Sequence, residues 1–272
     1  MMDSIQESDL EQQRIGDLMR LVRLIRSGGK TALDVGARDG RFSRLLVERF
    51  EQVTALDLDV PDIRIPGIAC VRGDVTDLHF DDDSFDLVVC TEVLEHIQAR
   101  GLAKAGLELS RVTRGYLLVG VPYRQDIRVG RTTCHACGAH NPPWGHVNSF
   151  DEATLLALFP GMTVEQTSWV GRNGERTNFV STFLMDLAGN AYGTYGQQET
   201  CVQCGAPVTT PTQRTLTQKA FTKLAFWARR PSELFHKTRP NWIHLLLRKP
   251  RGQAASTEAS ALAAHQFLMS TR

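Results

Sequence analysis

Short apolar runs alternate with amphipathic segments between residues 9 and 121, and this alternation constrains the fold more than any other feature of the chain. Runs of strand length predict strands, whereas apolar residues spaced three and four apart predict helices. The predicted strands are Thr31–Val35, Val53–Leu58, Ile68–Arg72, Phe85–Thr91 and Tyr116–Val121. The predicted helices are Asp9–Arg26, Arg41–Phe50 and Val93–Arg111. This order is typical of βαβ units, in which helices cover both faces of a parallel sheet.

The second half of the chain completes the predicted sheet. Asp151–Phe159 is predicted as a helix and Met162–Val170 as a strand. Residues 176–189 fit a helix better than a strand, because their apolar residues recur at helical spacing. Trp242–Leu247 is the closing strand. The predicted fold class is therefore α/β: a Rossmann-like, doubly wound, mostly parallel seven-stranded sheet with helices on both faces.

A glycine turn joins the first strand of the sheet to the following helix. Gly36 and Gly40 would allow the backbone to pass close to a ligand, and the helix amino terminus beyond them would offer free N–H groups. A Gly-x-x-x-Gly turn fits many nucleotide-binding folds, and it also fits a purely structural turn.

Acidic residues follow the next two strands. Asp57 ends the second strand about twenty residues after the turn, where such folds place a carboxylate that accepts hydrogen bonds from ribose hydroxyls. A solvated loop residue is the alternative. Asp74 follows the third strand, at a position suited to an adenine amino group, with Val75 against the ring. Residues 83–97 then give another strand and a Glu-rich helix start.

These motifs, in this order, strongly resemble the class I S-adenosylmethionine-dependent methyltransferases of the small-molecule type, including methyltransferases of the ubiquinone pathway. The resemblance covers residues 31–122. It implies that the methionine part of the cofactor is held by Asp34, Gly36, Ala37 and Gly40, the ribose by Asp57, and the adenine by Asp74 and Val75. Thr91 and Glu92 would line the cofactor and substrate side. Arg38 departs from the family pattern, which has a glycine at that position.

Two carboxylates and an imidazole follow the fourth strand. Glu92, Glu95 and His96 have i, i+3 and i+4 spacing, which places them on one face of the predicted helix. Such a set binds a divalent cation, for example Mg²⁺, that orients and acidifies a hydroxyl. The Glu-x-x-Glu-His string resembles metal-dependent O-methyltransferases of the ubiquinone pathway and small-RNA 2′-O-methyltransferases, and the segment around His146 is loosely similar to a downstream element of the RNA enzymes. In the metal-free alternative His96 or His146 is the general base, since only an imidazole titrates near neutrality without perturbation.

Four cysteines form two Cys-x-x-Cys-Gly segments, at Cys134 and Cys137 and at Cys201 and Cys204. This spacing lets two thiolates converge on one metal, so we predict one structural zinc with four cysteine ligands. The alternatives are partly buried thiols or a redox pair. The zinc would staple two insertions into a lid.

The charge of the chain is concentrated near its end, although the formal net charge is only +1. Between residues 209 and 252 there are ten Lys or Arg and one acidic residue. Residues 219–230 within this stretch predict a basic amphipathic helix, which either packs on its own domain or contacts a membrane surface or a lipid-linked acceptor. We find no recognisable RNA-binding module and do not expect a nucleic-acid partner.

No signal peptide or membrane span is predicted, because residues 1–9 are polar and no apolar run approaches the roughly 20 residues that cross a bilayer. We therefore expect a cytoplasmic location.

The predicted organisation has four parts. Residues 1–123 form the cofactor-binding half, 124–149 and 190–240 form the zinc-stapled lid, 150–189 and 241–249 complete the methyltransferase sheet, and 250–272 form a disordered tail. The predicted activity is S-adenosylmethionine-dependent O-methylation of a hydroxyl on a small molecule, a sugar, or a glycan or lipid-linked precursor. An RNA 2′-O-methyltransferase and a non-catalytic cofactor-binding interaction protein are the alternatives. The sequence indicates no oligomeric state.

Overall fold

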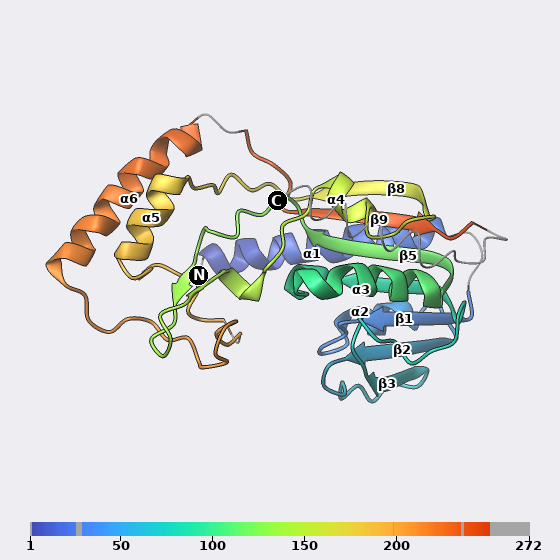
Figure 1. Ribbon diagram of the computed structural model, residues 1–272. Helices are drawn as coiled ribbons and strands as arrows, with labels where there is room; N and C mark the ends of the chain where they lie inside the picture. The colour runs from blue at the N-terminus through green and yellow to red at the C-terminus, as the bar shows by residue number, and fades with distance from the viewer. Residues whose placement is uncertain (1, 26–28, 198, 235–236, 251–272) are drawn as a thin grey trace. The chain divides into compact units, whose positions relative to one another are not determined.

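The computed structural model describes residues 2–25, 29–197, 199–234 and 237–250. The chain divides into two compact units. The first unit consists of Met1–Tyr123, Phe150–Gly171 and Pro240–Arg272, and the second of Arg124–Ser149 and Arg172–Arg239 (Figure 1). Each unit is therefore built from segments that are distant in sequence.

The first unit contains a seven-stranded sheet with the order β3-β2-β1-β4-β5-β9-β8. Its strands are β1 (Thr31–Val35), β2 (Gln52–Asp57), β3 (Ile68–Arg72), β4 (Phe85–Thr91), β5 (Thr113–Pro122), β8 (Thr163–Val170) and β9 (Trp242–Arg248). The first five strands pair in parallel, and β9 is antiparallel to both β5 and β8. The predicted doubly wound, mostly parallel sheet of seven strands is confirmed.

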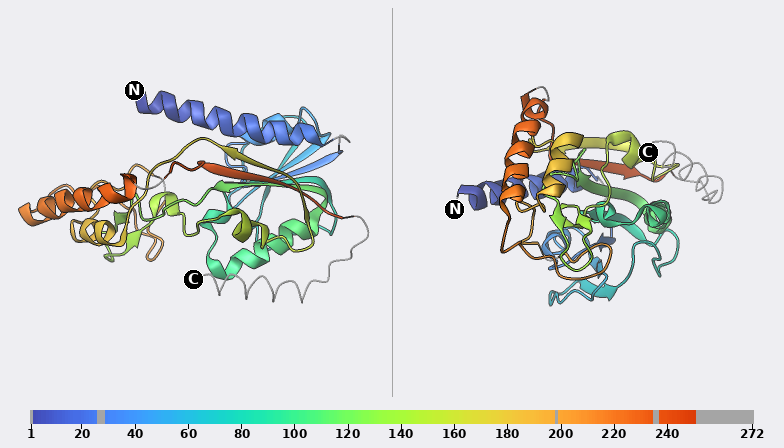
Figure 2. Two further views of the ribbon diagram at one scale, coloured as in Figure 1. Left: turned by 90° about the horizontal axis from the view of Figure 1, so that it is seen from above. Right: turned by 60° about the vertical axis from the view of Figure 1, so that its left-hand side comes forward.

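Alternating residues of the strands build two apolar layers, one on each face of the sheet. On one face, α1 (Met2–Leu24) and α2 (Arg41–Leu46) pack against side chains such as Leu87 and Leu118. On the other face, α3 (Ala99–Val112) and α4 (Glu152–Leu156) pack against their sequence neighbours, such as Val88 and Leu117. Figure 2 shows the sheet between α1 and α3. The central strands β1, β4, β5 and β9 are buried on both faces, as continuous apolar runs require, whereas the edge strands β3 and β8 are partly exposed.

Several predicted helices are shorter than the sequence pattern indicated, among them the helix predicted over 151–159, which is α4 (Glu152–Leu156). The helix predicted over 93–111 is wrong at its start: a 3₁₀ turn, η1 (Leu94–His96), is followed by extended residues Ile97 and Gln98 before α3 begins. The helix predicted over 41–50 ends at Leu46 and continues as turns. Apolar spacing continues through these breaks, so periodicity alone did not locate them.

The second unit holds a short hairpin of β6 (Thr132–Thr133) and β7 (His140–Asn141), a 3₁₀ turn η2 (Pro143–Gly145), and the helices α5 (Phe179–Leu187) and α6 (Leu216–Leu234). The helices predicted over 176–189 and 219–230 are confirmed. However, residues 172–189 belong to this unit and not to the sheet, because α5 packs on α6 through the face that carries Ser181.

The two segments of the second unit are inserted after β5 and after β8. Both strands run in the same direction, since each is antiparallel to β9, so both segments leave the first unit at the carboxyl edge of its sheet. None of the described helices combines the length and apolar character needed to cross a bilayer. The predicted disordered tail lies outside the described residues apart from Pro250.

Candidate active site

The carboxyl ends of β1 and β4 lie side by side at the point where the strand order reverses, which is where open α/β sheets bind ligands. The turn after β1 comes close to its neighbours. Gly36 has φ 79°, and a Cβ there would lie 2.3 Å from Cγ2 of Val93. Gly40 has φ 73°, and a Cβ there would lie 2.1 Å from Cδ1 of Ile63. Both positions therefore require glycine on conformational and steric grounds.

Asp57 at the end of β2 holds this turn in place. Its Oδ2 accepts a hydrogen bond from the backbone N–H of Arg38 at 2.8 Å, and its Oδ1 accepts one from Leu58 at 2.7 Å. Arg38 has φ 45°, in the left-handed region that favours a glycine such as the one in the family pattern, and its side chain is exposed. The departure at Arg38 thus leaves the backbone of the turn intact.

Asp34 has a buried carboxylate that joins β1 to α2. Its Oδ2 accepts a hydrogen bond from Oγ of Ser43 at 2.5 Å. Burial raises the pKa of Asp34 to about 6, although the Ser43 hydrogen bond acts to lower it. This side chain positions the turn. The predicted contact between Asp34 and the methionine part of the cofactor stays a prediction, as does that of Ala37, which packs among Ala55 and Ile63.

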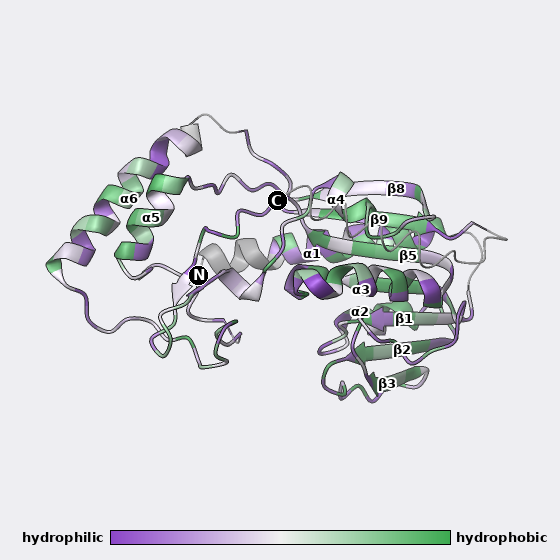
Figure 3. Cartoon of the chain, in the orientation of Figure 1, coloured by the Kyte–Doolittle hydropathy of each residue, from purple (hydrophilic) through white to green (hydrophobic). Residues whose placement is uncertain are grey.

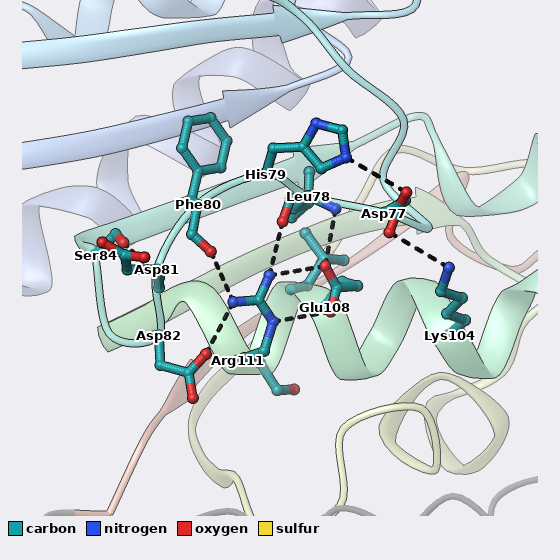
Figure 4. Close-up of polar contacts among 12 residues, drawn as sticks. Asp77, Leu78, His79, Phe80, Asp81, Asp82, Ser84, Lys104, Glu108 and Arg111 are labelled. Atoms are coloured by element: carbon teal, nitrogen blue, oxygen red, sulfur yellow. Dashed lines mark hydrogen bonds and ion pairs between the residues drawn. The ribbon is translucent and has the colours of Figure 1, made fainter.

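Asp74 and Val75 begin the connection from β3 to β4. Oδ1 of Asp74 accepts from the backbone N–H and the hydroxyl of Thr76, both at 2.8 Å, while Val75 is buried in the core. Arg111 of α3 fixes the rest of the connection (Figure 4). Its guanidinium donates to the carbonyls of Leu78 at 2.8 Å and Phe80 at 2.7 Å. The adenine contacts predicted for Asp74 and Val75 are untested, but the loop that carries them is well anchored.

Arg111 is itself held by two carboxylates. Its guanidinium also donates to Glu108 and Asp82, each at 2.9 Å. These partners, Glu108 first, raise the pKa of Arg111. The backbone N–H of Leu78 donates to Glu108 at 2.8 Å, so one carboxylate holds both the arginine and the loop.

Thr91 ends β4, and Glu92 and Glu95 follow it. The backbone N–H of Glu92 donates to the carbonyl of Gly120 at 2.9 Å, and Glu92 has φ 57°, so it is not helical. The predicted helical face that would carry Glu92, Glu95 and His96 together is therefore wrong. The carboxylates nevertheless interact electrostatically across the turn.

Neither carboxylate is fully satisfied. Oε1 of Glu92 and both carboxylate oxygens of Glu95 are buried without a hydrogen-bond partner among the described residues. Trp242 hydrogen-bonds Glu92 through its side chain, and Arg14 of α1 contributes a nearby positive charge. Burial raises the pKa of Glu92. The pKa of Glu95 is also raised, first by burial and then by the nearby charge of Glu92. Buried, unsatisfied carboxylates cost free energy unless a ligand completes them.

Arg14 and Trp242 were missed by the sequence analysis. Arg14 is held by Glu11 through two hydrogen bonds of 2.7 and 2.8 Å, and its guanidinium carbon lies 5.9 Å from the centroid of the Trp242 ring. The position of Arg14 in the sequence could have identified it, because it lies four residues from both Leu10 and Leu18 on the apolar stripe of the first helix. A charge on an apolar stripe needs a buried partner.

His96 and His146 fall in different units. His96 is exposed, and a ligand nitrogen of its ring lies within 4.8 Å of a carboxylate oxygen of Glu95. His146 is buried in the second unit, where its Nδ1 lies 2.6 Å from Oε1 of Gln125. Their predicted cooperation at one acceptor is untested.

The four cysteines come together in the second unit, as predicted. Sγ of Cys134 lies 3.7 Å from Sγ of Cys204, and Sγ of Cys137 lies 3.7 Å from Sγ of Cys201. Because four ligands at the usual zinc–sulfur distance of about 2.3 Å are about 3.8 Å apart in a tetrahedron, these separations fit one zinc ion.

The two cysteine segments also share one backbone conformation. In the first, Cys134 donates to the carbonyl of Ala139 and accepts from Gly138, each at 2.9 Å. In the second, Cys201 donates to Ala206 and accepts from Gly205, again at 2.9 Å. Two matched knuckles that face each other are the arrangement that a closed four-cysteine metal site requires, whereas isolated thiols need no such matching.

Comparison with known proteins agrees with this geometry. Residues 33–118 match a family model described as a methyltransferase domain. A protein of Mycolicibacterium smegmatis (strain ATCC 700084 / mc(2)155), described as an S-adenosylmethionine-dependent methyltransferase, is 30% identical over 151 residues. That match covers 52% of this chain and 55% of the relative, so it spans about half of the relative's length.

Two solved structures are similar in fold. A Bacillus halodurans C-125 protein assigned as a methyltransferase matches with a TM-score of 0.55 and 16% identity, covering 86% of this chain and 99% of its own. The N-methyltransferase NodS from Bradyrhizobium japonicum WM9, in complex with S-adenosyl-L-homocysteine, matches with a TM-score of 0.50 and 15% identity over 89% of this chain and 88% of its own. In its sheet order and glycine turn, the first unit is similar in fold to these methyltransferases. The residues that match the methyltransferase domain model, 33–118, all lie in the first unit.

Proposed function

We propose that this protein transfers a methyl group to a hydroxyl oxygen of a small molecule, a sugar, or a glycan or lipid-linked precursor. The observation that carries the proposal is the pair of carboxylates at the carboxyl end of β4, Glu92 and Glu95, three of whose oxygen atoms are buried without a hydrogen-bond partner among the described residues. A hydroxyl donates a hydrogen bond to a carboxylate, so an acceptor placed there would satisfy atoms that the protein leaves unsatisfied.

The residues around the glycine turn fit S-adenosylmethionine. Gly36 and Gly40 allow the left-handed turn after β1 to pack against Val93 and Ile63. Asp57, already fixed by two backbone N–H groups, retains lone pairs for ribose hydroxyls. When bound, the cofactor supplies an electrophilic methyl group. The protein's own contribution would be to align the acceptor oxygen and to accept its proton.

Two versions of the acceptor site follow from the same residues. In the first, Glu95 and His96, with Glu92 nearby, hold a divalent cation such as Mg²⁺, which would lower the pKa of the acceptor hydroxyl. In the second, no cation binds and a carboxylate or His96 accepts the proton directly. The raised pKa values of Glu92 and Glu95 fit either version, since a cation or a proton relieves their mutual repulsion.

We propose further that Cys134, Cys137, Cys201 and Cys204 bind one zinc ion whose role is structural. The two matched knuckles and the 3.7 Å sulfur separations support this assignment. Four thiolates leave no open coordination position for a substrate.

The test is methyl transfer from labelled S-adenosylmethionine to a panel of hydroxylated and amine-bearing acceptors. Glu95→Gln is expected to lower turnover on the order of 10²–10⁴-fold, while cofactor affinity stays unchanged. Glu48→Gln, an exposed carboxylate remote from the strand ends, is the matched control. Loss of activity on chelation, restored by Mg²⁺ and not by zinc, would select the first version. Transfer to amines alone, or full activity of Glu95→Gln, would contradict the proposal.

A further inference from the structure

Arg239 is a buried arginine that forms no ion pair with a described residue. It is only 8% exposed. Among the described residues its guanidinium donates one hydrogen bond, from Nη2 to the carbonyl of Glu175 at 3.2 Å. A guanidinium has five N–H donors, and a buried cation costs free energy unless an opposite charge pairs with it. The surroundings of Arg239 therefore favour an anionic ligand.

Two further arginines place positive charge near Arg239. Arg176 is partly buried, and its side chain makes no hydrogen bond or ion pair with any described residue. The pKa of Arg239 is lowered, first by burial, then by the charge of Arg176 and to a smaller extent by that of Arg124. Like charges held close together repel one another, so an anion bound among them would lower the free energy of the folded protein.

Two carboxylates also act on Arg239, but neither forms an ion pair with it. Both carboxylate oxygens of Asp126 accept hydrogen bonds from the guanidinium of Arg128, at 2.8 and 3.0 Å. Oδ2 of Asp126 also accepts from the backbone N–H of Thr177 at 2.9 Å. The other carboxylate, Glu175, is exposed and makes no ion pair with a described residue. These acidic groups therefore leave Arg239 and Arg176 without a carboxylate partner in the described part of the chain.

Hydrogen bonds hold the segments that carry the three arginines together. The backbone groups of Asn173 and Arg239 bond reciprocally, at 2.6 and 2.9 Å. The bond from Thr177 to Asp126 joins the same segment to residues 124–128. Figure 3 shows hydrophilic residues, in purple, along the segments that follow β5 and β8. All three arginines therefore lie on one hydrogen-bonded framework within the second unit.

We infer that Arg239, Arg176 and Arg124 bind a phosphate group. A guanidinium presents paired N–H donors that match the oxygens of a phosphate bidentately. Two arginines without a carboxylate partner, Arg239 and Arg176, suit a ligand with about two negative charges. A phosphate monoester carries about −1.5 to −2 near pH 7, whereas a carboxylate carries a single charge.

The phosphate belongs either to the methyl acceptor, in which case the inference rests on the proposed function, or to free inorganic phosphate. The arginines lie close in sequence to the strands of the methyltransferase sheet. Arg124 follows the end of β5 by two residues, and Arg239 precedes Trp242, which hydrogen-bonds Glu92, by three. Both sources offer the same chemistry to the arginines, and the experiments below separate them.

The first test is titration calorimetry of the full-length protein with inorganic phosphate and with acetate, at one ionic strength of about 0.1 M. We expect phosphate to bind and acetate to bind more weakly. Arg176→Gln should lower the affinity for phosphate about 10- to 100-fold, because a charge-assisted hydrogen bond is lost. Since the side chain of Arg176 pairs with no described residue, this variant should keep the melting temperature of the wild type.

Arg239→Gln separates phosphate binding from a structural role. Without phosphate its melting temperature should equal or exceed that of the wild type, because an unpaired buried charge is removed. Phosphate should raise the melting temperature of the wild type but not that of the variant. An equal rise in both proteins would overturn the inference.

Arg172→Gln, which removes an exposed arginine of the same unit, is the charge-matched control and should bind phosphate like the wild type. Equal loss of affinity in this control would show that net charge is responsible and not the three arginines. Failure of the wild type to bind phosphate would also overturn the inference. Calorimetry requires no methyl transfer, so this test is independent of the proposed function.

Methyl transfer to matched acceptors, with and without a phosphate monoester, then identifies the source of the phosphate. A preference for the phosphorylated acceptor that Arg176→Gln abolishes would assign the phosphate to the acceptor. Equal rates with both acceptors, with calorimetric binding intact, would identify inorganic phosphate as the ligand. A preference for the phosphorylated acceptor that survives in both Arg176→Gln and Arg239→Gln would contradict the assignment of these arginines.

Discussion

Nδ1 of His244 lies 2.7 Å from Oδ2 of Asp17, and this contact joins β9 to α1 inside the first unit. His244 is fully buried, and burial lowers its pKa despite the hydrogen bond to Asp17, which acts to raise it. The pKa of Asp17 is lowered to about 2: burial acts to raise it, but hydrogen bonds from His244, Arg20 and Ser168 outweigh this. At neutral pH a neutral imidazole therefore donates to an ionised carboxylate.

This pair should make the protein less stable in acid. As the pH falls below about 6.5, the unfolded chain protonates His244 before the folded protein does, so the free energy of unfolding decreases. The contribution of Asp17 is present above about pH 4 and is lost as the pH falls through about 2. Urea unfolding at pH 7.5 and pH 5 measures the first effect.

His244→Gln keeps a donor toward Asp17 but does not titrate, so it should lose less stability between pH 7.5 and pH 5 than the wild type. Asp34 increases the free energy of unfolding as the pH falls, because its pKa is raised to about 6 in the folded protein. This effect is the same in the variant and in the wild type. The difference between variant and wild type is therefore the informative quantity. An equal loss in both proteins would contradict the role assigned to His244.

Zinc removal should destabilise the second unit. Cys134 and Cys201 are buried together with Val208 in its small apolar cluster, so a zinc ion bound by the proposed site would stabilise a unit with a small core. Cys204→Ser is expected to reduce bound zinc from about one ion per chain to a small fraction, as measured by elemental analysis. Cys70→Ala, a cysteine of the first unit, is the control and should retain the metal. Full zinc content in Cys204→Ser would exclude the four-cysteine site.

Asp57→Asn should weaken cofactor binding by about 1.5–3 kcal/mol, because hydrogen bonds to a charged acceptor become bonds to a neutral one. Calorimetry with S-adenosyl-L-homocysteine measures this change. Asp59→Asn alters an exposed carboxylate two residues away and should bind like the wild type. An unchanged affinity of Asp57→Asn would show that the ribose is held by other residues.

Arg111→Met should lower the free energy of unfolding by about 2 kcal/mol, since the guanidinium binds two loop carbonyls and two carboxylates at once. Arg100→Met changes an exposed arginine of the same helix and should have little effect. Chemical denaturation compares the two. If both variants unfold alike, the connection from β3 to β4 does not depend on the arginine.

The central strands of the sheet were predictable because they are continuous apolar runs, as two-sided burial requires. β1, β3 and β4 match their predicted limits, and the approximate position of β9 was also correct. The four cysteines were predictable because their spacing is set by the metal and not by the rest of the fold. These signals are local, and each can be read within a few residues.

The acceptor side of the site was only partly predictable because its contacts are not local. Glu92 is not part of a helix, because its backbone is left-handed. Residue propensities do not predict this conformation, since glutamate is uncommon in it. Arg14 reaches the carboxylates from the first helix, about eighty residues earlier in the chain. The exposure of the apolar side chains of α5 could not be predicted from the sequence either, because periodicity locates an apolar stripe but does not say whether the fold covers it.

The position of β9 between β5 and β8 also has a consequence for synthesis. These two strands leave the ribosome long before their shared neighbour, which begins roughly 120 residues after β5 ends. Until Trp242–Arg248 emerges, the nascent sheet exposes unpaired backbone groups along β5, and β8 has no partner at all. The sheet of the first unit is therefore completed only after the whole second unit has been synthesised. During this interval the growing chain is prone to pair with other chains.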